Sequence, residues 1–309
     1  MSSISENKTN ILLETGTNEI EIMEFTIDGN LYGINVAKVR EIIMSDKVKP
    51  MPHSHPAVEG VFKPRDILLT VVDLPMYLTD VPSKKNPKDL FIITNFNNLN
   101  IAFRVHTVEG ISRISWGDIQ KPDKTVSGGE EGVATGIAQC GDDLVTILDF
   151  EKIVAEIAPE TTIQISEIEK LGARDRNETP IVLAEDSILL TKMIRESLKK
   201  AGYINLKEFN NGQEAWEYLS SLKDNAGSIK SEASLIITDI EMPKMDGHRL
   251  TKLVKSDDIL KNIPVIIFSS LINPEMQIKG KQVGADEQLS KPEIGYLVEV
   301  IDQLLIRSK

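Results

Sequence analysis

The chain has 309 residues, which is enough for about two domains of the common size of roughly 150 residues. Its net charge of −12 and its 5% aromatic content argue against a nucleic-acid surface, because such a surface needs basic residues for phosphates and rings for stacking. The single cysteine, Cys140, excludes an internal disulfide, and no stretch approaches the ~18 apolar residues of a membrane span.

Residues 1–18 form a polar segment, which we expect to be a flexible tail without a signal peptide. We expect no membrane insertion and a cytoplasmic location. From residue 19 to residue 157 short apolar stretches alternate with turn residues. Asp28-Gly29 and Cys140-Gly141-Asp142-Asp143 are typical of hairpin turns. We therefore predict an all-β domain over 19–157.

This β region repeats itself at an offset of 76 residues. The segment Leu69–Leu74 matches Val145–Phe150, and at the same offset Gly60-Val61 matches Gly136-Ile137. A looser similarity relates the segments around Ile34 and Phe103. We predict two similar small barrels, because closed sheets leave no unpaired edge on such short strands.

Residues 158–179 change in composition and are predicted to be a linker with one helical stretch. From residue 180 to residue 309 continuous apolar runs alternate with helical patterns. The runs are Ile181–Ala184, Leu235–Thr238 and Val265–Phe268, and the clearest helices are around Leu190–Ala201 and Ile294–Leu305. Buried runs between helices predict a doubly wound parallel sheet, and ligands of such sheets lie at the carboxyl ends of the strands.

Polar residues stand at those strand ends. Glu185 and Asp186 follow the first strand, Asp239 follows the second, Ser269 ends the third, and Lys291 precedes Pro292 after a further short strand. Three close carboxylates repel one another, and Mg²⁺ relieves this because it prefers oxygen ligands. One carboxylate can accept a phosphoryl group while the ammonium and the hydroxyl stabilise its oxygens. Taken singly, such residues are more often helix caps, turn residues or solvated loop charges, and only their joint placement at the strand ends points to a site.

The segment Asp239-Ile240-Glu241-Met242-Pro243-Lys244-Met245-Asp246-Gly247, together with the steps to Ser269 and Lys291, resembles the response-regulator receiver family over about residues 180–306. The resemblance implies a flavodoxin-like five-stranded parallel sheet. It implies that Asp239 is phosphorylated by a histidine kinase, and that Glu185, Asp186, Asp239 and the backbone carbonyl of Glu241 hold Mg²⁺. Ser269 and Lys291 would contact the phosphoryl oxygens.

The sequence departs from that family at the position three residues before the lysine. The family usually has an aromatic switch residue there, and this chain has Gln288. Glu185 replaces the usual Asp, and Ser269 keeps the usual hydroxyl. The coupled movement of hydroxyl and ring is therefore in doubt for this chain.

The β region resembles the CheW-like coupling domain in its segments Val58–Phe62 and Val71–Leu74, with Arg65 between them. The order of the two domains resembles that of CheV-type chemotaxis adaptors. This implies two SH3-like barrels that bind chemoreceptor tips and the chemotaxis histidine kinase at membrane-associated receptor arrays. Arg65 is our candidate for partner binding; an ordinary surface charge is the alternative.

Three functions remain open at this stage. The first is a non-enzymatic adaptor whose docking changes on phosphorylation, as in adaptation. The second is an adaptor whose receiver is a phosphate sink, which Gln288 makes more credible. The third is an aspartate-nucleophile phosphohydrolase, which usually has Asp where Glu241 stands. The four histidines lack ligand-type neighbours at suitable spacing, so we expect no histidine metal site.

Overall fold

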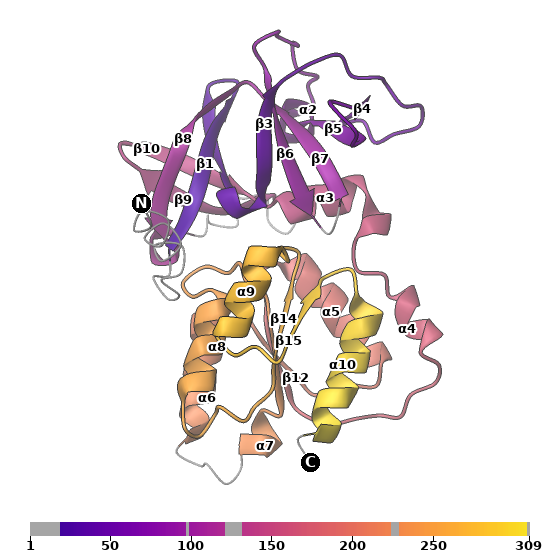
Figure 1. The fold of residues 1–309 in the computed structure, drawn as a ribbon, viewed down its shortest axis with the longest axis vertical. Helices are drawn as coiled ribbons and strands as arrows, with labels where there is room; N and C mark the ends of the chain where they lie inside the picture. The colour runs from indigo at the N-terminus through magenta and orange to yellow at the C-terminus, as the bar shows by residue number, and fades with distance from the viewer. Residues whose placement is uncertain (1–18, 97–98, 121–131, 224–228, 308–309) are drawn as a thin grey trace, which may run out of the picture. The chain divides into compact units, whose positions relative to one another are not determined.

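The structure is a computed structural model that describes residues 19–96, 99–120, 132–223 and 229–307. The predicted tail, residues 1–18, lies outside the described residues. The chain divides into two compact units. We call residues 20–114 with 118–159 the β unit, and residues 160–309 the α/β unit. Figure 1 shows the strands of the β unit, and the sheet of the α/β unit with its helices.

The β unit contains two five-stranded sheets. The first has the order β8-β1-β2-β10-β9 and the second the order β3-β6-β7-β5-β4. The strands are β1 (Glu19–Ile27), β2 (Asn30–Asn35), β3 (Val39–Met44), β4 (Val58–Phe62), β5 (Leu69–Asp73), β6 (Leu90–Phe96), β7 (Leu99–Val105), β8 (Thr107–Ser115), β9 (Ala134–Cys140) and β10 (Asp143–Leu148). Two short helices follow β5 and β10, namely α2 (Leu74–Thr79) and α3 (Phe150–Ile157).

Both predicted hairpins are present. Ile27 pairs with Asn30 across Asp28-Gly29, and both turn residues have positive φ, at 49° and 80°. Cys140 pairs with Asp143 across Gly141-Asp142, and Gly141 has φ of 60°. Two-residue turns of this kind match the right-handed twist of the paired strands.

The predicted repeat appears in the strand order. When β1 to β5 are matched in sequence order with β6 to β10, the order of one sheet becomes the order of the other. Each sheet combines the first two strands of one repeat with the last three of the other, through the parallel pairs β10–β2 and β5–β7. The two repeats are therefore interlocked, and neither can form its sheet alone.

The matched residues have the same structural role in both copies of the repeat. Asp73 and Asp149 cap α2 and α3 by accepting the backbone N–H of Met76 and Lys152. Gly60 and Gly136 each precede a residue that forms an antiparallel bridge with a residue outside the strands. Val61 pairs with Lys49, and Ile137 pairs with Gln120. A Cβ on Gly60 would lie 2.1 Å from the Lys49 carbonyl oxygen.

The main apolar core of the β unit lies between its sheets and helices. Phe150 of α3 packs edge-on against Phe103 of β7 at 4.8 Å and against Phe25 of β1 at 6.3 Å between ring centroids. A second cluster, with Leu69, Val71 and Phe91 at its centre, fills the other face of the second sheet. The repeat thus encloses apolar residues on both faces of that sheet.

The α/β unit has a five-stranded parallel sheet of order β12-β11-β13-β14-β15, as predicted. Its strands are β11 (Ile181–Ala184), β12 (Leu206–Phe209), β13 (Leu235–Thr238), β14 (Val265–Ser269) and β15 (Glu287–Ser290). Its helices are α4 (Ser166–Lys170), α5 (Ile188–Lys200), α6 (Gly212–Ser221), α7 (Ile229–Glu232), α8 (Gly247–Ser256), α9 (Pro274–Gln282) and α10 (Ile294–Arg307).

Helices cover both faces of this sheet (Figure 1). Ile194 of α5 and Ile301 of α10 pack on one face, against Ile237 and its neighbours. Leu219 of α6 and Leu250 of α8 pack on the other face, against Ile236. Alternate residues of one strand therefore enter two separate cores, which explains why the strands are apolar throughout.

The expected linker segment packs onto the α/β unit. Ile163 and Ile168, each 2% exposed, belong to the core formed by α5 and α10. The segment contains the short helix α4. Among the residues that the structure describes, no helix combines the length and the apolar character needed to cross a membrane.

Candidate functional site

The carboxyl ends of β11, β13 and β15 bring three of the predicted site residues into contact. The Lys291 Nζ lies 2.9 Å from Asp239 Oδ2 and 3.1 Å from Glu185 Oε2. All three side chains are buried, with 2–3% of each residue exposed. Parallel strands end at the same edge of a sheet, so residues separated by 52 and 106 positions become neighbours here.

Asp186 completes an acidic cluster with Glu185 and Asp239. One ligand oxygen from each of the three lies within 4.8 Å of the others, and within the described ranges this is the single group of three or more acidic, His or Cys residues so placed. The histidines of the described ranges do not enter such a group. The cluster is a set of hard oxygen donors of the kind that Mg²⁺ prefers.

The charges of the cluster favour a cation. Three carboxylates and one ammonium leave a formal charge of −2 in a largely buried site. Lys291 offsets part of the repulsion, but uncompensated buried charge remains costly. A divalent cation would bring the formal charge to zero, so these residues fit Mg²⁺.

The backbone around Asp239 holds its carboxylate in place. Asp239 Oδ1 accepts the Ile240 N–H at 2.6 Å, which leaves Oδ2 directed at Lys291. The loop then closes on itself because the Gly247 N–H donates to the Ile240 carbonyl at 2.9 Å. A Cβ on Gly247 would lie 1.8 Å from the Asp239 carbonyl oxygen, so only glycine permits this loop.

The remaining predicted residues of the α/β unit lie nearby but make other contacts. Ser269 is fully buried at the end of β14, and its Oγ accepts the Leu271 N–H at 3.2 Å. Glu241 is 9% exposed and stands two residues after Asp239. Gln288 lies within β15, where its Nε2 donates to the Gln277 carbonyl of α9 at 2.9 Å. Their roles in the site stay predictions.

Arg65 lies in the β unit, on the loop between β4 and β5. Its side chain is 79% exposed, with a long ion pair of 3.7 Å to Glu41 of the edge strand β3. The same loop exposes Ile67 and Leu68, at 37% and 62%. An exposed cation beside exposed apolar side chains is a feature of docking surfaces.

Comparisons with known proteins agree with this division. The model of the CheW-like domain matches residues 21–158, and the model of the response regulator receiver domain matches residues 181–302. The chain is 30% identical over 299 residues to chemotaxis protein CheV3 of Helicobacter pylori, with 93% of this chain and 95% of that protein covered. The chain belongs to the CheV family of chemotaxis proteins.

A second CheV protein of Helicobacter pylori, CheV2, is 27% identical over 309 residues, with 93% of this chain and 95% of that protein covered. Among solved structures, the scaffolding protein TtCheW of Thermoanaerobacter tengcongensis covers 42% of this chain and 83% of its own, with 22% identity and a TM-score of 0.38. As a CheV protein, the chain is a chemotaxis coupling adaptor with a receiver domain. This confirms the family and the fold inferred from the sequence.

The sequence did not reveal two features of the receiver domain. The first is the burial of Ile163 and Ile168. The apolar residues of this segment, at positions 163, 165, 168 and 171, give only a weak helical signal. The contact between Gln288 and α9 was also missed. It joins residues 11 apart through a backbone carbonyl, and no side-chain pattern indicates such a bond.

Proposed function

We propose that this CheV-family adaptor couples chemoreceptors to the chemotaxis histidine kinase, and that phosphorylation of Asp239 by that kinase modulates the coupling during adaptation. The observation that carries this proposal is the buried contact of Lys291 with Asp239 and Glu185, on a receiver domain joined to a CheW-like domain. The adaptor would be cytoplasmic and recruited to membrane-associated receptor arrays.

Phosphoryl transfer would begin at Asp239. Its Oδ2 attacks the phosphorus of a phosphohistidine, the O–P bond forms as the P–N bond breaks, and the departing imidazole takes up a proton. When bound, Mg²⁺ would be held by Glu185, Asp186 and Asp239 with the Glu241 carbonyl, and would neutralise charge on the transferred oxygens. An attacking carboxylate oxygen has no proton to lose, so no separate base is needed.

Lys291 and Ser269 would stabilise the transferred group. The Lys291 ammonium stands 2.9 Å from the attacking oxygen and can turn to a phosphoryl oxygen with little movement. The Ser269 Oγ accepts the Leu271 N–H, so its own proton stays available for donation. Both groups lie in a buried site, where charged hydrogen bonds are stronger than in water.

The CheW-like domain would supply docking, with Arg65 and the adjacent Ile67 and Leu68 in contact with the receptor tips or the kinase. Their exposure on one loop supports this role. We propose no enzymatic activity for the chain.

A second candidate is the phosphate sink, in which the receiver drains phosphoryl groups from the kinase without altering docking. Gln288 favours this candidate, because its amide is already bonded to α9 and it lacks the aromatic ring that receiver domains usually move. A kinase assay on receptor complexes separates the two. A switch changes kinase activity per phosphorylated adaptor, and a sink changes only the flow of phosphate.

The central test is Asp239→Asn, with radiolabelled phospho-kinase as donor and full-length adaptor as acceptor. We expect no acid-labile label on the variant, since an amide is too weak a nucleophile, while the near-identical size of the side chain keeps the fold. Asp258→Asn is the matched control, because Asp258 is an exposed carboxylate of the same domain paired with Lys261. Label on the Asp239→Asn variant equal to that of the control contradicts the assignment, and release of free phosphate from small phosphomonoesters favours the phosphohydrolase.

A further inference from the structure

Residues 160–179, which we call the arm, lie outside both matched family models. The CheW-like model ends at residue 158 and the receiver model begins at residue 181. Covalently, the arm begins directly after α3 and the short turn at Pro159, and it ends before β11. It is therefore the only stretch of chain through which a change in the receiver can be passed along the backbone to the CheW-like domain.

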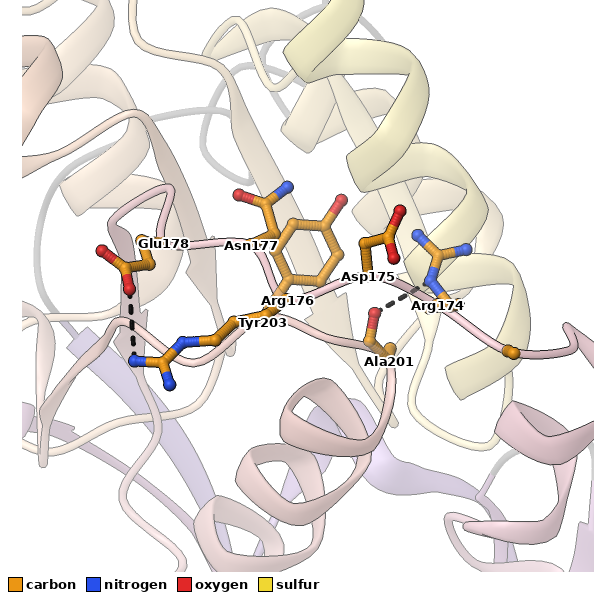
Figure 2. Close-up of a pocket in the computed structure, with 8 residues that line it drawn as sticks. Arg174, Asp175, Arg176, Asn177, Glu178, Ala201 and Tyr203 are labelled. Atoms are coloured by element: carbon orange, nitrogen blue, oxygen red, sulfur yellow. Dashed lines mark hydrogen bonds and ion pairs between the residues drawn. The ribbon is translucent and has the colours of Figure 1, made fainter.

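The arm is fixed to the receiver at both of its ends. Near its start, Ile163 and Ile168 are buried with residues of α5 and α10. Near its end, Arg174 donates to both carboxylate oxygens of Asp302 on α10, at 2.6 and 2.7 Å, and to the Ala201 carbonyl at 2.8 Å. Figure 2 shows this end of the arm lying along Ala201 and Tyr203, beside a polar pocket.

Backbone pairing adds to this attachment. Asn177 accepts the Ile204 N–H and donates its own N–H to the Gly202 carbonyl, which forms a parallel bridge after α5. The Tyr203 hydroxyl donates to Asp302 as well, and burial together with this bond raises the pKa of Tyr203. These contacts make the arm a part of the receiver domain.

Glu167 of the arm contacts the start of α10, the helix that follows Lys291. The Glu167 Oε2 accepts the Gly295 N–H at 3.3 Å. Gly295 is the second residue of α10, where backbone N–H groups lack helical partners and a carboxylate is favoured. The Glu167 side chain thus holds the start of α10 four residues beyond Lys291.

Backbone hydrogen bonds restrain the segment between Lys291 and Gly295. The Glu293 N–H donates to the Ser290 carbonyl and the Ile294 N–H to the Pro292 carbonyl, both at 2.9 Å. A displacement of Lys291 is therefore passed to the first turn of α10. Since Lys291 now contacts Asp239 and Glu185, a phosphoryl group on Asp239 offers its ammonium a new partner and shifts it.

We propose that the arm reports the phosphorylation state of Asp239 to the CheW-like domain, with Glu167 as the positioning residue that joins it to α10. This inference rests on the proposed phosphorylation of Asp239. Phosphorylation turns Lys291 toward the phosphoryl oxygens, the start of α10 moves with it, and the bond from Gly295 to Glu167 weakens. The arm then opens more often, which changes the restraint on the chain that leads to α3.

The test is hydrogen exchange of the full-length chain, measured by mass spectrometry with Mg²⁺ alone and with Mg²⁺ plus beryllofluoride, a mimic of the acyl phosphate. We expect amides of the arm to exchange at least roughly 5-fold faster with beryllofluoride, within the usual range of coupling between two sites. Asp239→Asn should abolish the change. Glu167→Ala should make arm exchange fast under both conditions, and Glu167→Gln, which keeps an acceptor oxygen, should restore part of the difference.

Glu169→Ala is the matched control. Glu169 lies on the same helix, but its carboxylate pairs with Lys200 on α5. The control should respond to beryllofluoride as the wild type does. An equal response from Glu167→Ala would remove Glu167 from the mechanism.

The loop of residues 269–273 separates the possible failures. If that loop gains protection with beryllofluoride while arm exchange stays unchanged, the phosphosite is correct and the arm proposal is wrong. If neither segment responds, the phosphosite assignment fails and the arm proposal falls with it. Circular dichroism of each variant identifies any loss of fold.

Discussion

His248 is a buried histidine of α8 that takes no part in the proposed phosphoryl chemistry. It is 1% exposed, and the charges of Lys279 on α9 and of Asp246 at the start of α8 act on its imidazole. Burial lowers its pKa to about 4, and Lys279 acts in the same direction while Asp246 opposes it. The folded receiver therefore holds this imidazole neutral.

This gives a prediction for stability against pH. Between about pH 6.5 and pH 4 the unfolded chain binds a proton at this residue and the folded chain does not, so the free energy of unfolding falls as the pH falls. The loss attributable to His248 is up to about 3 kcal/mol. We expect His248→Gln to abolish this pH-dependent loss of stability. Urea titrations followed by Trp216 fluorescence, in a Trp116→Phe background, measure it.

The exposed His53 provides the control for this prediction. His53→Gln should leave the pH profile of the receiver transition unchanged. If the free energy of unfolding of His248→Gln still falls with pH as in the wild type, carboxylates and not His248 cause the acid sensitivity.

Residues at strand ends could be predicted from the sequence because the rule that places them is topological. Asp239, Glu185 and Lys291 each follow an apolar strand, and parallel strands end together. The direction of the Ser269 hydroxyl could not be predicted. It depends on a hydrogen bond to Leu271, two residues on, and a turn of one side-chain torsion would change it.

At the scale of elements, α9 is the least firmly packed of the long receiver helices. Gly280 is its one buried residue, whereas α8 buries five. The Gln288 amide fills the space that a Cβ on Gly280 would occupy, since that Cβ would lie 2.0 Å from Gln288 Oε1. This polar contact between β15 and α9 stands where receiver domains usually place an aromatic ring.

We therefore expect phosphorylation to move Gln288 little, with the output carried by the charge at Asp239, by residues 270–274 and by Lys291 with the start of α10. Gln288→Ala should change phosphorylation-dependent kinase control by no more than about 5-fold, because it removes one exposed hydrogen bond of about 1 kcal/mol. Gln288→Tyr should enlarge the difference between the two states, since a ring has a large apolar area that prefers burial. The measurement is kinase activity in receptor–kinase assemblies with and without phosphodonor.

Label incorporation at Asp239 is the control for both Gln288 variants and should equal that of the wild type. Loss of phosphorylation-dependent control in Gln288→Ala, with normal labelling, would make Gln288 a working switch and would contradict this account.

The elements of the β unit were predictable only in part. The offset of 76 residues predicted equivalent strands, and Asp73 and Asp149 do cap equivalent helices. The exchange of strands between the two sheets was not predictable, because equivalent strands have equivalent patterns and either pairing satisfies them.

At the scale of the whole molecule, the boundary between the domains depends on contacts that are distant in sequence. Arg174 and Asp302 are 128 residues apart, and so are Glu167 and Gly295. Composition alone favoured a linker over 158–179, since no local pattern shows that a segment will pack on a helix so far along the chain. By its internal contacts the structure groups residues from Glu160 onward with the receiver sheet, and the bounds of the linker stay a prediction.

The last prediction follows from that assignment and concerns two receiver fragments. A fragment of residues 160–309 should be more stable than one of residues 180–309, because the shorter one exposes the apolar surface that Ile163 and Ile168 cover and leaves Asp302 without Arg174. Each isoleucine contributes about 1.5–3 kcal/mol when fully buried, so the difference should be several kcal/mol. Urea unfolding of the two fragments measures it, and phosphoryl transfer to both shows that Asp239 remains competent.

In the longer fragment, Ile168→Ala should lower the stability by about 2–5 kcal/mol, whereas Ile188→Ala, at a site 63% exposed, should change it little. Equal midpoints for the two fragments would mean that the arm adds nothing to the receiver, and the segment would then be the simple linker that its composition suggested.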